Sequence, residues 1–370
     1  MKVFLAVVLI LLLAAAGTAA YLWYGIENPY QGFASEGVFV TIPRGSSSRG
    51  AARILQKNGV IRSATAFEFY ARRHPKRSLE AGEYFFDHAT SGKDVFWKLA
   101  KGEVYELPFT VREGETIYDI AHDLEAAKFM SAADFVRAAK DSSGIKDLAP
   151  YARTLEGFLF PATYQLPRHP VATDLTTKMV QKFREQWRAI SVSDPAPASA
   201  ARPTLSIVTL ASLVERETPK PDERPLVAGV FENRLRKGMP LQCDPTVIYA
   251  LEQVGKYSGT LTGKDLHYDS PYNTYEHGGL PPGPIGNPGE VALRAAVAPA
   301  QTDYLYFVAN TQGGHFFGAT LADHNKNVNR YHRLLQGLPA DPPPPPPPAK
   351  KKTPAKARSK NKQAKKRRSE

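Results

Sequence analysis

The longest apolar segment of the chain lies at its beginning. Val3–Tyr24 contains 22 residues without a charge, and as a helix it would extend roughly 33 Å, enough to cross a bilayer. Lys2 precedes it and acidic residues follow, which favours a cytoplasmic N-terminus. A membrane anchor over residues 1–27 and a cleaved signal peptide both fit this pattern. The apolar run continues past Ala14–Ala16, so an uncleaved anchor is favoured; either one exports the rest of the chain.

Short strand-like runs and helical periodicities alternate after this segment. Residues 114–124 repeat the layout of residues 45–55 at an offset of 69, with Gly114 matching Gly45 and Leu124 matching Leu55. A duplicated strand–helix–helix unit explains this likeness, although unrelated amphipathic helices can also resemble one another. The strands are expected at 38–43, 83–86 and 105–111, and the helices at 49–57, 64–73 and 93–101.

The second half of the chain is dominated by longer helical patterns. A loop-rich stretch, 257–287, interrupts them, and residues 304–310 and 315–318 form a β-pair around Gly313 and Gly314. The helices are expected at 171–190, 204–217, 223–236, 246–253 and 322–335. The fold class is therefore α+β, with an α-rich second half and a small β-pair.

The positive charge of the chain is concentrated at its end. The formal net charge of the 370 residues is +12, but residues 350–370 hold eleven Lys or Arg and one Glu. A proline run, Pro342–Pro348, precedes this tail, so a stiff spacer and a disordered basic tail are expected over 338–370. On the exported side such a tail would meet anionic envelope polymers or act only as a solubilising segment, and nucleic acid is not expected there.

Two glutamates end the apolar helical run "LASLVERETPKP". At about 100° per residue, Glu215 and Glu217 point roughly 200° apart, so they cannot both line one groove. Small neighbours suggest free space above Glu215, and a carboxylate at a helix C-terminus should retain its proton more readily. A solvated role for both, paired with Arg216 and Lys220, is the alternative.

Further polar residues are candidates for binding sugars. Gln242 and Asp244 precede a helix, where Asp244 could equally serve as a cap. Asn273 and Tyr275 stand in a probable loop, where aromatic and amide side chains suit a carbohydrate groove. Cys243 is the only cysteine, and no histidine pair has metal-ligand spacing, so neither a metal nor a cofactor is predicted.

Several segments together resemble the endolytic peptidoglycan (murein) transglycosylases, the MltG or YceG-like family. They cover roughly residues 36 to 336 in the family's order: "EGFLFPATY", "LASLVERET", "ERPLVAGVFENRLRKGMPLQCDPTVIYAL", "YNTYEHGGLPPGPIGNPG" and "YLYFVAN…GGHFFGATLADHN". The resemblance implies cleavage of the β-1,4 bond between N-acetylmuramic acid and N-acetylglucosamine, giving 1,6-anhydro-N-acetylmuramic acid ends. It also implies that the first glutamate of the helix motif, here Glu215, is the catalytic acid and base.

The same resemblance implies a domain plan. The plan has an inner-membrane anchor (1–27), a LysM-like βααβ region (28–150, its second unit near 108–150), a catalytic domain (151–337) and the tail (338–370). Nascent peptidoglycan strands are the expected substrate and peptidoglycan synthases the expected partners. Glu217, Gln242, Asp244, Asn273 and Tyr275 are the expected substrate-binding residues. A non-catalytic peptidoglycan-binding scaffold and a water-using muramidase are the remaining alternatives.

Overall fold

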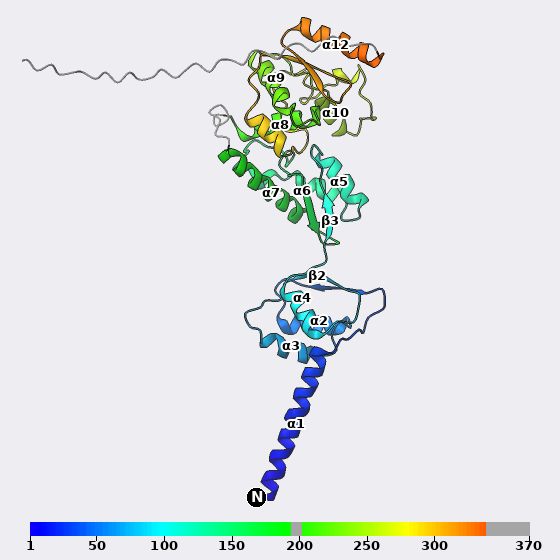
Figure 1. Cartoon of the computed structure of the whole chain (residues 1–370), viewed down its shortest axis with the longest axis vertical. Helices are drawn as coiled ribbons and strands as arrows, with labels where there is room; N and C mark the ends of the chain where they lie inside the picture. Colours follow the sequence, from blue (N-terminus) through cyan, green and yellow to red (C-terminus); the bar gives the residue numbers. More distant parts are fainter. Residues whose placement is uncertain (194–201, 338–370) are drawn as a thin grey trace, which may run out of the picture.

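The fold is a mixed α+β arrangement drawn out along one axis (Figure 1). The structure is a computed structural model that describes residues 1–193 and 202–337. Over these residues it contains twelve α-helices and three two-stranded antiparallel sheets. The proline spacer and the basic tail predicted over 338–370 lie outside the described residues.

Helix α1 (Lys2–Glu27) projects from one end of the molecule (Figure 1). Its mean hydropathy reaches 2.7 and the apolar window is entirely unburied, so by length and composition it can cross a membrane. Only Gly25 and Ile26, in its last turn, are buried. The helix therefore ends inside the first folded unit, which fits the predicted anchor.

The first folded unit, the N-terminal module, comprises residues 28–104 and has its own hydrophobic core. Its strands pair antiparallel, with Val38 opposite Phe86. Two helices lie between these strands in sequence, which gives a strand–helix–helix–strand order. The elements are β1 (Val38–Ile42), α2 (Ser48–Lys57), α3 (Ala64–Arg72), β2 (Gly82–Phe86) and α4 (Gly92–Ala100).

The next segment repeats this order, as the internal sequence likeness predicted. Gly45 and Gly114 both have positive φ, 78° and 82°, and each precedes a helix whose first turn is capped by a hydroxyl, from Ser47 or Thr116. The elements are β3 (Leu107–Thr110), α5 (Ile117–Ala126), α6 (Ala132–Ala139), the 3-10 helix η1 (Ser142–Ile145) and β4 (Thr163–Leu166). Strand β4 was not predicted, and it lies beyond the domain boundary expected at residue 150.

This second unit shares one hydrophobic core with all that follows it, and together they form the body of the molecule. The remaining elements are α7 (Ala172–Ser193), α8 (Thr204–Glu217), α9 (Arg224–Arg236), α10 (Asp244–Glu252), η2 (Asp265–His267), α11 (Glu290–Val297), β5 (Tyr306–Ala309), β6 (His315–Gly318) and α12 (Leu321–Leu335). Helix α8 lies at the centre, since its residues 207–215 are all buried. Helix α11, which the sequence reading missed, packs against it.

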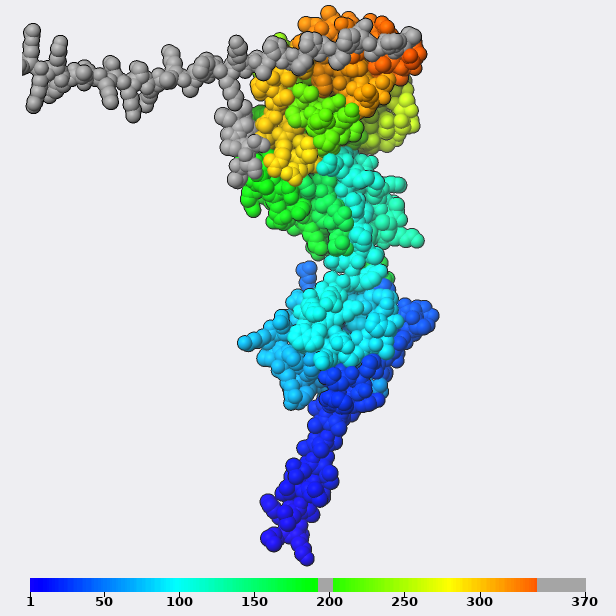
Figure 2. Space-filling view, viewed as in Figure 1, coloured from blue at the N-terminus to red at the C-terminus, as the bar shows by residue number. Residues whose placement is uncertain are grey.

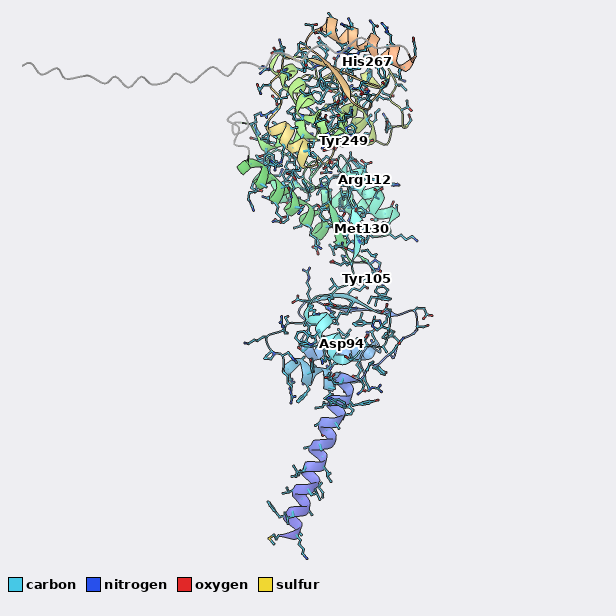
Figure 3. The ribbon with its side chains drawn as sticks, viewed as in Figure 1. Asp94, Tyr105, Arg112, Met130, Tyr249 and His267 are labelled. Carbon is cyan, nitrogen blue, oxygen red and sulfur yellow. The ribbon has the colours of Figure 1, made fainter. Side chains whose placement is uncertain are left out.

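The N-terminal module and the body meet at a narrow connection (Figure 2). Tyr105 lies in this connection (Figure 3), where its ring packs edge-on against Phe39 with centroids 5.0 Å apart. Arg168 from the body covers the same Phe39 ring at 3.9 Å. One stacked arginine and a small aromatic cluster therefore bridge the two parts.

Asn287 holds three separate segments of the body together. Its amide nitrogen donates to the carbonyl of Glu115 at 2.8 Å and to Glu156 Oε1 at 3.0 Å. Its amide oxygen accepts from the N–H groups of Gly157 at 2.9 Å and Leu159 at 3.0 Å. Asn287 is fully buried, and its side chain is a partner of Glu156 Oε1 and of the Gly157 and Leu159 N–H groups; the Glu115 carbonyl also accepts from the Asn287 backbone N–H at 2.9 Å.

Replacing Asn287 with alanine should lower the free energy of unfolding by roughly 3 kcal/mol, since several buried polar groups lose their partner. Urea denaturation of the full chain in detergent measures this. Asn329→Ala, at an exposed position on α12, is the matched control and should change little. Equal stability of the two variants would contradict the assigned role of Asn287.

Candidate active site

The candidate site begins at the C-terminal end of α8. Thr218 has an extended backbone (φ −138°, ψ 129°), as expected for a residue before proline, and this ends the helix directly after Glu217. Glu215 and Glu217 therefore occupy the last turn. Helical geometry sends their side chains to opposite faces, and the structure confirms that they have separate surroundings.

Glu215 faces the interior of the body. Arg224 donates to Glu215 Oε1 in a close ion pair, and the N–H of Gly289 donates to Glu215 Oε2 at 3.0 Å. The side chains of Glu215 and Arg224 are only 4% and 6% exposed. Arg224 also lies 3.4 Å from Glu113 Oε2, in the loop before α5. The ion pair thus joins α8 to α9. Through Glu113 it also contacts the loop before α5, and through Gly289 it contacts the loop before α11.

Free space was expected above Glu215, but this expectation is wrong. The chain itself fills the space, because Gly114 and Gly289 approach from two loops and Ile285 N donates to Ser212 Oγ at 3.0 Å. Burial raises the pKa of Glu215 to about 7, while the Gly289 N–H and Arg224 oppose the shift. The direction of the pKa shift was predicted correctly, although burial causes it, and Glu215 does not line the groove that Glu217 faces.

Glu217 faces a groove of about 520 Å³. The groove is walled by the end of α8, by α9, by the segment before α10, by β5 and by the start of α12. Its lining is Glu217, Arg234, Leu241, Gln242, Asp244, Tyr275, Tyr306–Ala309, His315, Leu321 and His324. The volume is within the range of small-molecule and oligomer-binding sites. Glu215 is not part of this lining.

The carboxyl group of Glu217 is weakly partnered. Its Oε2 accepts from the thiol of Cys243 at 3.3 Å, and no ion pair within residues 1–193 and 202–337 neutralises it. Burial raises the pKa of Glu217 to about 7, Asp244 adds to the rise, and the Cys243 thiol and Arg234 oppose it. A carboxyl group on a groove wall whose pKa is raised toward neutrality suits a general acid.

Four of the five predicted substrate-binding residues line this groove: Glu217, Gln242, Asp244 and Tyr275. Gln242 has a positive φ of 51°, an uncommon conformation for a residue with a side chain. Asp244 does not cap α10, because it is the first helical residue and its carboxylate instead accepts from Tyr275 Oη at 2.5 Å. Burial and the Asp244 carboxylate raise the pKa of Tyr275, so its phenol keeps its proton and donates.

Asn273 does not line the groove, contrary to expectation. It is fully buried, and its amide nitrogen donates to the carbonyls of Leu266 at 2.8 Å and Tyr268 at 2.9 Å. Its amide oxygen accepts from Tyr275 N at 2.9 Å. Asn273 therefore shapes the loop that presents Tyr275, and its polar atoms are already engaged within the chain.

Two cationic or ionisable groups of the groove were missed by the sequence reading. Arg234 donates to the carbonyls of Leu305 at 2.7 Å and Leu241 at 2.9 Å, which holds its guanidinium in the wall. His315 Nδ1 lies 2.7 Å from Glu223 Oε2. Glu223, at the N-terminus of α9, makes no side-chain cap and instead orients this histidine. The only feature of the sequence that could have indicated His315 as a groove residue was its proximity to the β-turn.

Other chemistries find little support in the site. Burial raises the pKa of the Cys243 thiol well above its usual range, so a thiolate nucleophile is disfavoured. Among the described residues, no three His, Cys, Asp or Glu side chains come together in a way that could hold a metal ion.

A wide groove with a carboxyl group that retains its proton near neutral pH defines an enzyme that uses acid–base chemistry. The comparison with family models identifies the particular family: the YceG-like family model matches residues 40–330. The chain belongs to the YceG-like family.

Two relatives of this chain carry the name endolytic murein transglycosylase. The endolytic murein transglycosylase of Bacillus subtilis (strain 168) is 35% identical over 319 residues, covering 80% of this chain and 84% of that protein. The protein of the same name in Streptococcus pneumoniae (strain R6) is 30% identical over 87% of this chain, which spans only 63% of its length. The crystal structure of a YceG-like protein from Listeria monocytogenes shares 34% identity, with a TM-score of 0.51 over 79% of this chain and 99% of that one.

The raised carboxyl pKa values predict how stability depends on pH. Glu217 (pKa about 7) and Glu156 (about 8, raised by burial) keep protons in the folded state that the unfolded state releases near 4.5. The free energy of unfolding should therefore fall as pH rises from about 4.5 to 8. His324, whose pKa burial lowers, acts in the opposite direction over part of this window.

Denaturation of wild type and Glu217→Gln across this window isolates one group. The variant should show a shallower fall than wild type, whereas the exposed Glu36→Gln control should retain the full slope. A variant slope as steep as that of wild type would show that Glu217 does not take up a proton in this range.

Proposed function

We propose that this protein is an endolytic murein transglycosylase, which cleaves peptidoglycan glycan strands internally as a lyase. The observation that carries this proposal is the position of Glu217 on the wall of a 520 Å³ groove, beside Asp244 and Tyr275. Family membership and the names of the curated relatives support the substrate class.

In the first step, protonated Glu217 donates to the glycosidic oxygen between N-acetylmuramic acid and N-acetylglucosamine. The C1–O bond breaks, the N-acetylglucosamine end leaves with the proton, and positive charge develops at C1 and the ring oxygen. The carboxylate of Asp244 lies in the same wall and is positioned to favour that charge. Tyr275, through its 2.5 Å hydrogen bond, orients Asp244.

In the second step, the 6-hydroxyl of the same N-acetylmuramic acid residue attacks C1. Glu217, now a carboxylate, takes the hydroxyl proton, and a 1,6-anhydro ring closes without water. The first step leaves Glu217 in the protonation state that the second requires. One carboxyl group therefore suffices, in contrast to the two that ordinary glycosidases use.

Glu215, the acid expected from the sequence, competes with Glu217 for this role. It is not part of the groove lining, and its two carboxyl oxygens are already engaged by Arg224 and by the N–H of Gly289. We therefore assign Glu215 to positioning, as the residue that fixes the end of α8. The catalytic role of Glu215 stays a prediction that the variants below test.

The rest of the domain plan is part of the proposal. Helix α1 would anchor the chain in the inner membrane with the body on the exported side. The two strand–helix–helix–strand units would be LysM-like and grip N-acetylglucosamine. The pairing of β3 with β4 favours placing the second unit over residues 107–166 rather than ending it at residue 150. Peptidoglycan synthases would be partners, and the basic tail would contact anionic envelope polymers.

Product analysis distinguishes the two glutamates and the two chemistries. Mass spectrometry of peptidoglycan digested by the full chain should show anhydro ends with wild type and with Glu276→Gln, a control at an exposed carboxylate outside the groove. Glu217→Gln should form them roughly 10²–10⁴-fold more slowly, the usual contribution of a general acid. Its unfolding should stay cooperative.

Glu215→Gln should instead lower the free energy of unfolding, because it breaks a buried ion pair, and the molecules that remain folded should still form anhydro ends. Loss of products only in Glu215→Gln, at normal stability, would restore Glu215 as the acid. Reducing ends from wild type would identify a muramidase. Binding without any cleavage would identify a scaffold.

A further inference from the structure

We propose that the groove between α1 and α3 binds one anionic glycerophospholipid from the bilayer that α1 enters. An acyl chain would lie along α1 and the phosphate would meet Arg73. This inference rests on the anchoring part of the proposed function and is independent of the catalytic part. It concerns a site on the N-terminal module, whereas the catalytic groove lies in the body.

The groove has a volume of about 580 Å³ and an apolar floor. Its α1 residues recur at helical spacing and so form one face of the helix. They are Ala15, Thr18, Ala19, Leu22, Trp23, Ile26 and Glu27, and α3 contributes Phe69, Tyr70 and Arg73. From Ala15 to Glu27 the helix rises roughly 18 Å, a length comparable to an acyl chain that reaches into the bilayer.

Helix α3 packs against the part of α1 where its uncharged run ends. Tyr21 Oη donates to Ser63 Oγ at 3.0 Å, and a Cβ at Gly25 would lie only 3.0 Å from that of Ala66. Figure 1 shows α3 at the base of the N-terminal module, beside the end of α1. Trp23 is exposed in the same turns of α1, where aromatic side chains typically mark the membrane interface.

Phe69 supports a lipid occupant. Its side chain is 41% exposed on the outer face of α3, where it faces the groove rather than a protein core. Arg73 covers its ring, with the guanidinium 4.4 Å from the ring centroid. An apolar surface next to an unpaired cation matches a lipid, which presents an acyl chain next to a phosphate.

The positive charges around the groove favour a lipid with an anionic headgroup. Residues 62–77 contain five Lys or Arg and one carboxylate, Glu68. Glu68 is already paired with Arg49 and Arg72, and Glu27 with Lys93. Within the described chain, Arg73 has no ion-pair partner. A phospholipid whose phosphate charge is not balanced by a choline group, and which is therefore anionic, complements this surface best.

The test compares lipids retained by the full chain. The protein is placed in nanodiscs of equal phosphatidylglycerol and phosphatidylcholine, released, and weighed by native mass spectrometry. Wild type should retain one phosphatidylglycerol molecule in preference to phosphatidylcholine. Arg73→Gln should weaken retention roughly fivefold, the effect of about one basic group at an anionic surface. Ala19→Trp, which fills the groove without changing charge, should also reduce it.

Arg53→Gln is the control, because Arg53 is exposed on α2 of the same module and lies outside the groove. Equal retention of both lipids, or retention unchanged in both Arg73→Gln and Ala19→Trp, would overturn the proposal. So would selective retention of an added polyprenyl phosphate in place of phospholipid. An alkaline carbonate wash tests the anchor separately: a chain that stays in the membrane but retains no phosphatidylglycerol keeps its anchor and loses only this site.

Discussion

The ion pair between Glu215 and Arg224 determines where the last turn of α8 lies. It joins α8 to α9, and the Gly289 N–H extends the connection to the loop before α11. Because both side chains are buried, removing either partner would leave the other without its partner in the interior, which is costly. With Glu215 fixed inward, the roughly 200° of helix between the two glutamates sends Glu217 into the groove. The position of the proposed acid thus follows from an interaction on the opposite face.

Loops from distant parts of the chain complete this arrangement. Asn287 ties the loop before α5 and the segment before β4 to the loop that carries Gly289. The second strand–helix–helix–strand unit therefore shares a hydrophobic core with the elements of the candidate site, whereas the N-terminal module has a separate core.

The local elements were largely predictable, because they depend on short-range patterns. Apolar periodicity placed α8 at its observed bounds, and the offset of 69 residues anticipated the matching positions of Gly45 and Gly114. The predictions that failed depend on the course of loops, which apolar periodicity does not indicate. The space expected over Glu215 is occupied by the loop of Gly289, which lies 74 residues further along the chain. The side-chain amide of Asn273 is already hydrogen-bonded to carbonyl groups of its own loop. The apolar periodicity of a sequence does not indicate which face of a helix lines a groove.

The most direct measurement is a crystal structure of the full-length Glu217→Gln variant with a bound peptidoglycan tetrasaccharide. The account predicts a glycosidic oxygen within hydrogen-bonding reach, about 2.6–3.2 Å, of the amide that replaces the Glu217 carboxyl group. The sugar rings should lie along Tyr275 and Asp244, with Glu215 still paired to Arg224. A glycan that displaces the Gly289 loop and places its glycosidic oxygen against Glu215 would contradict the account.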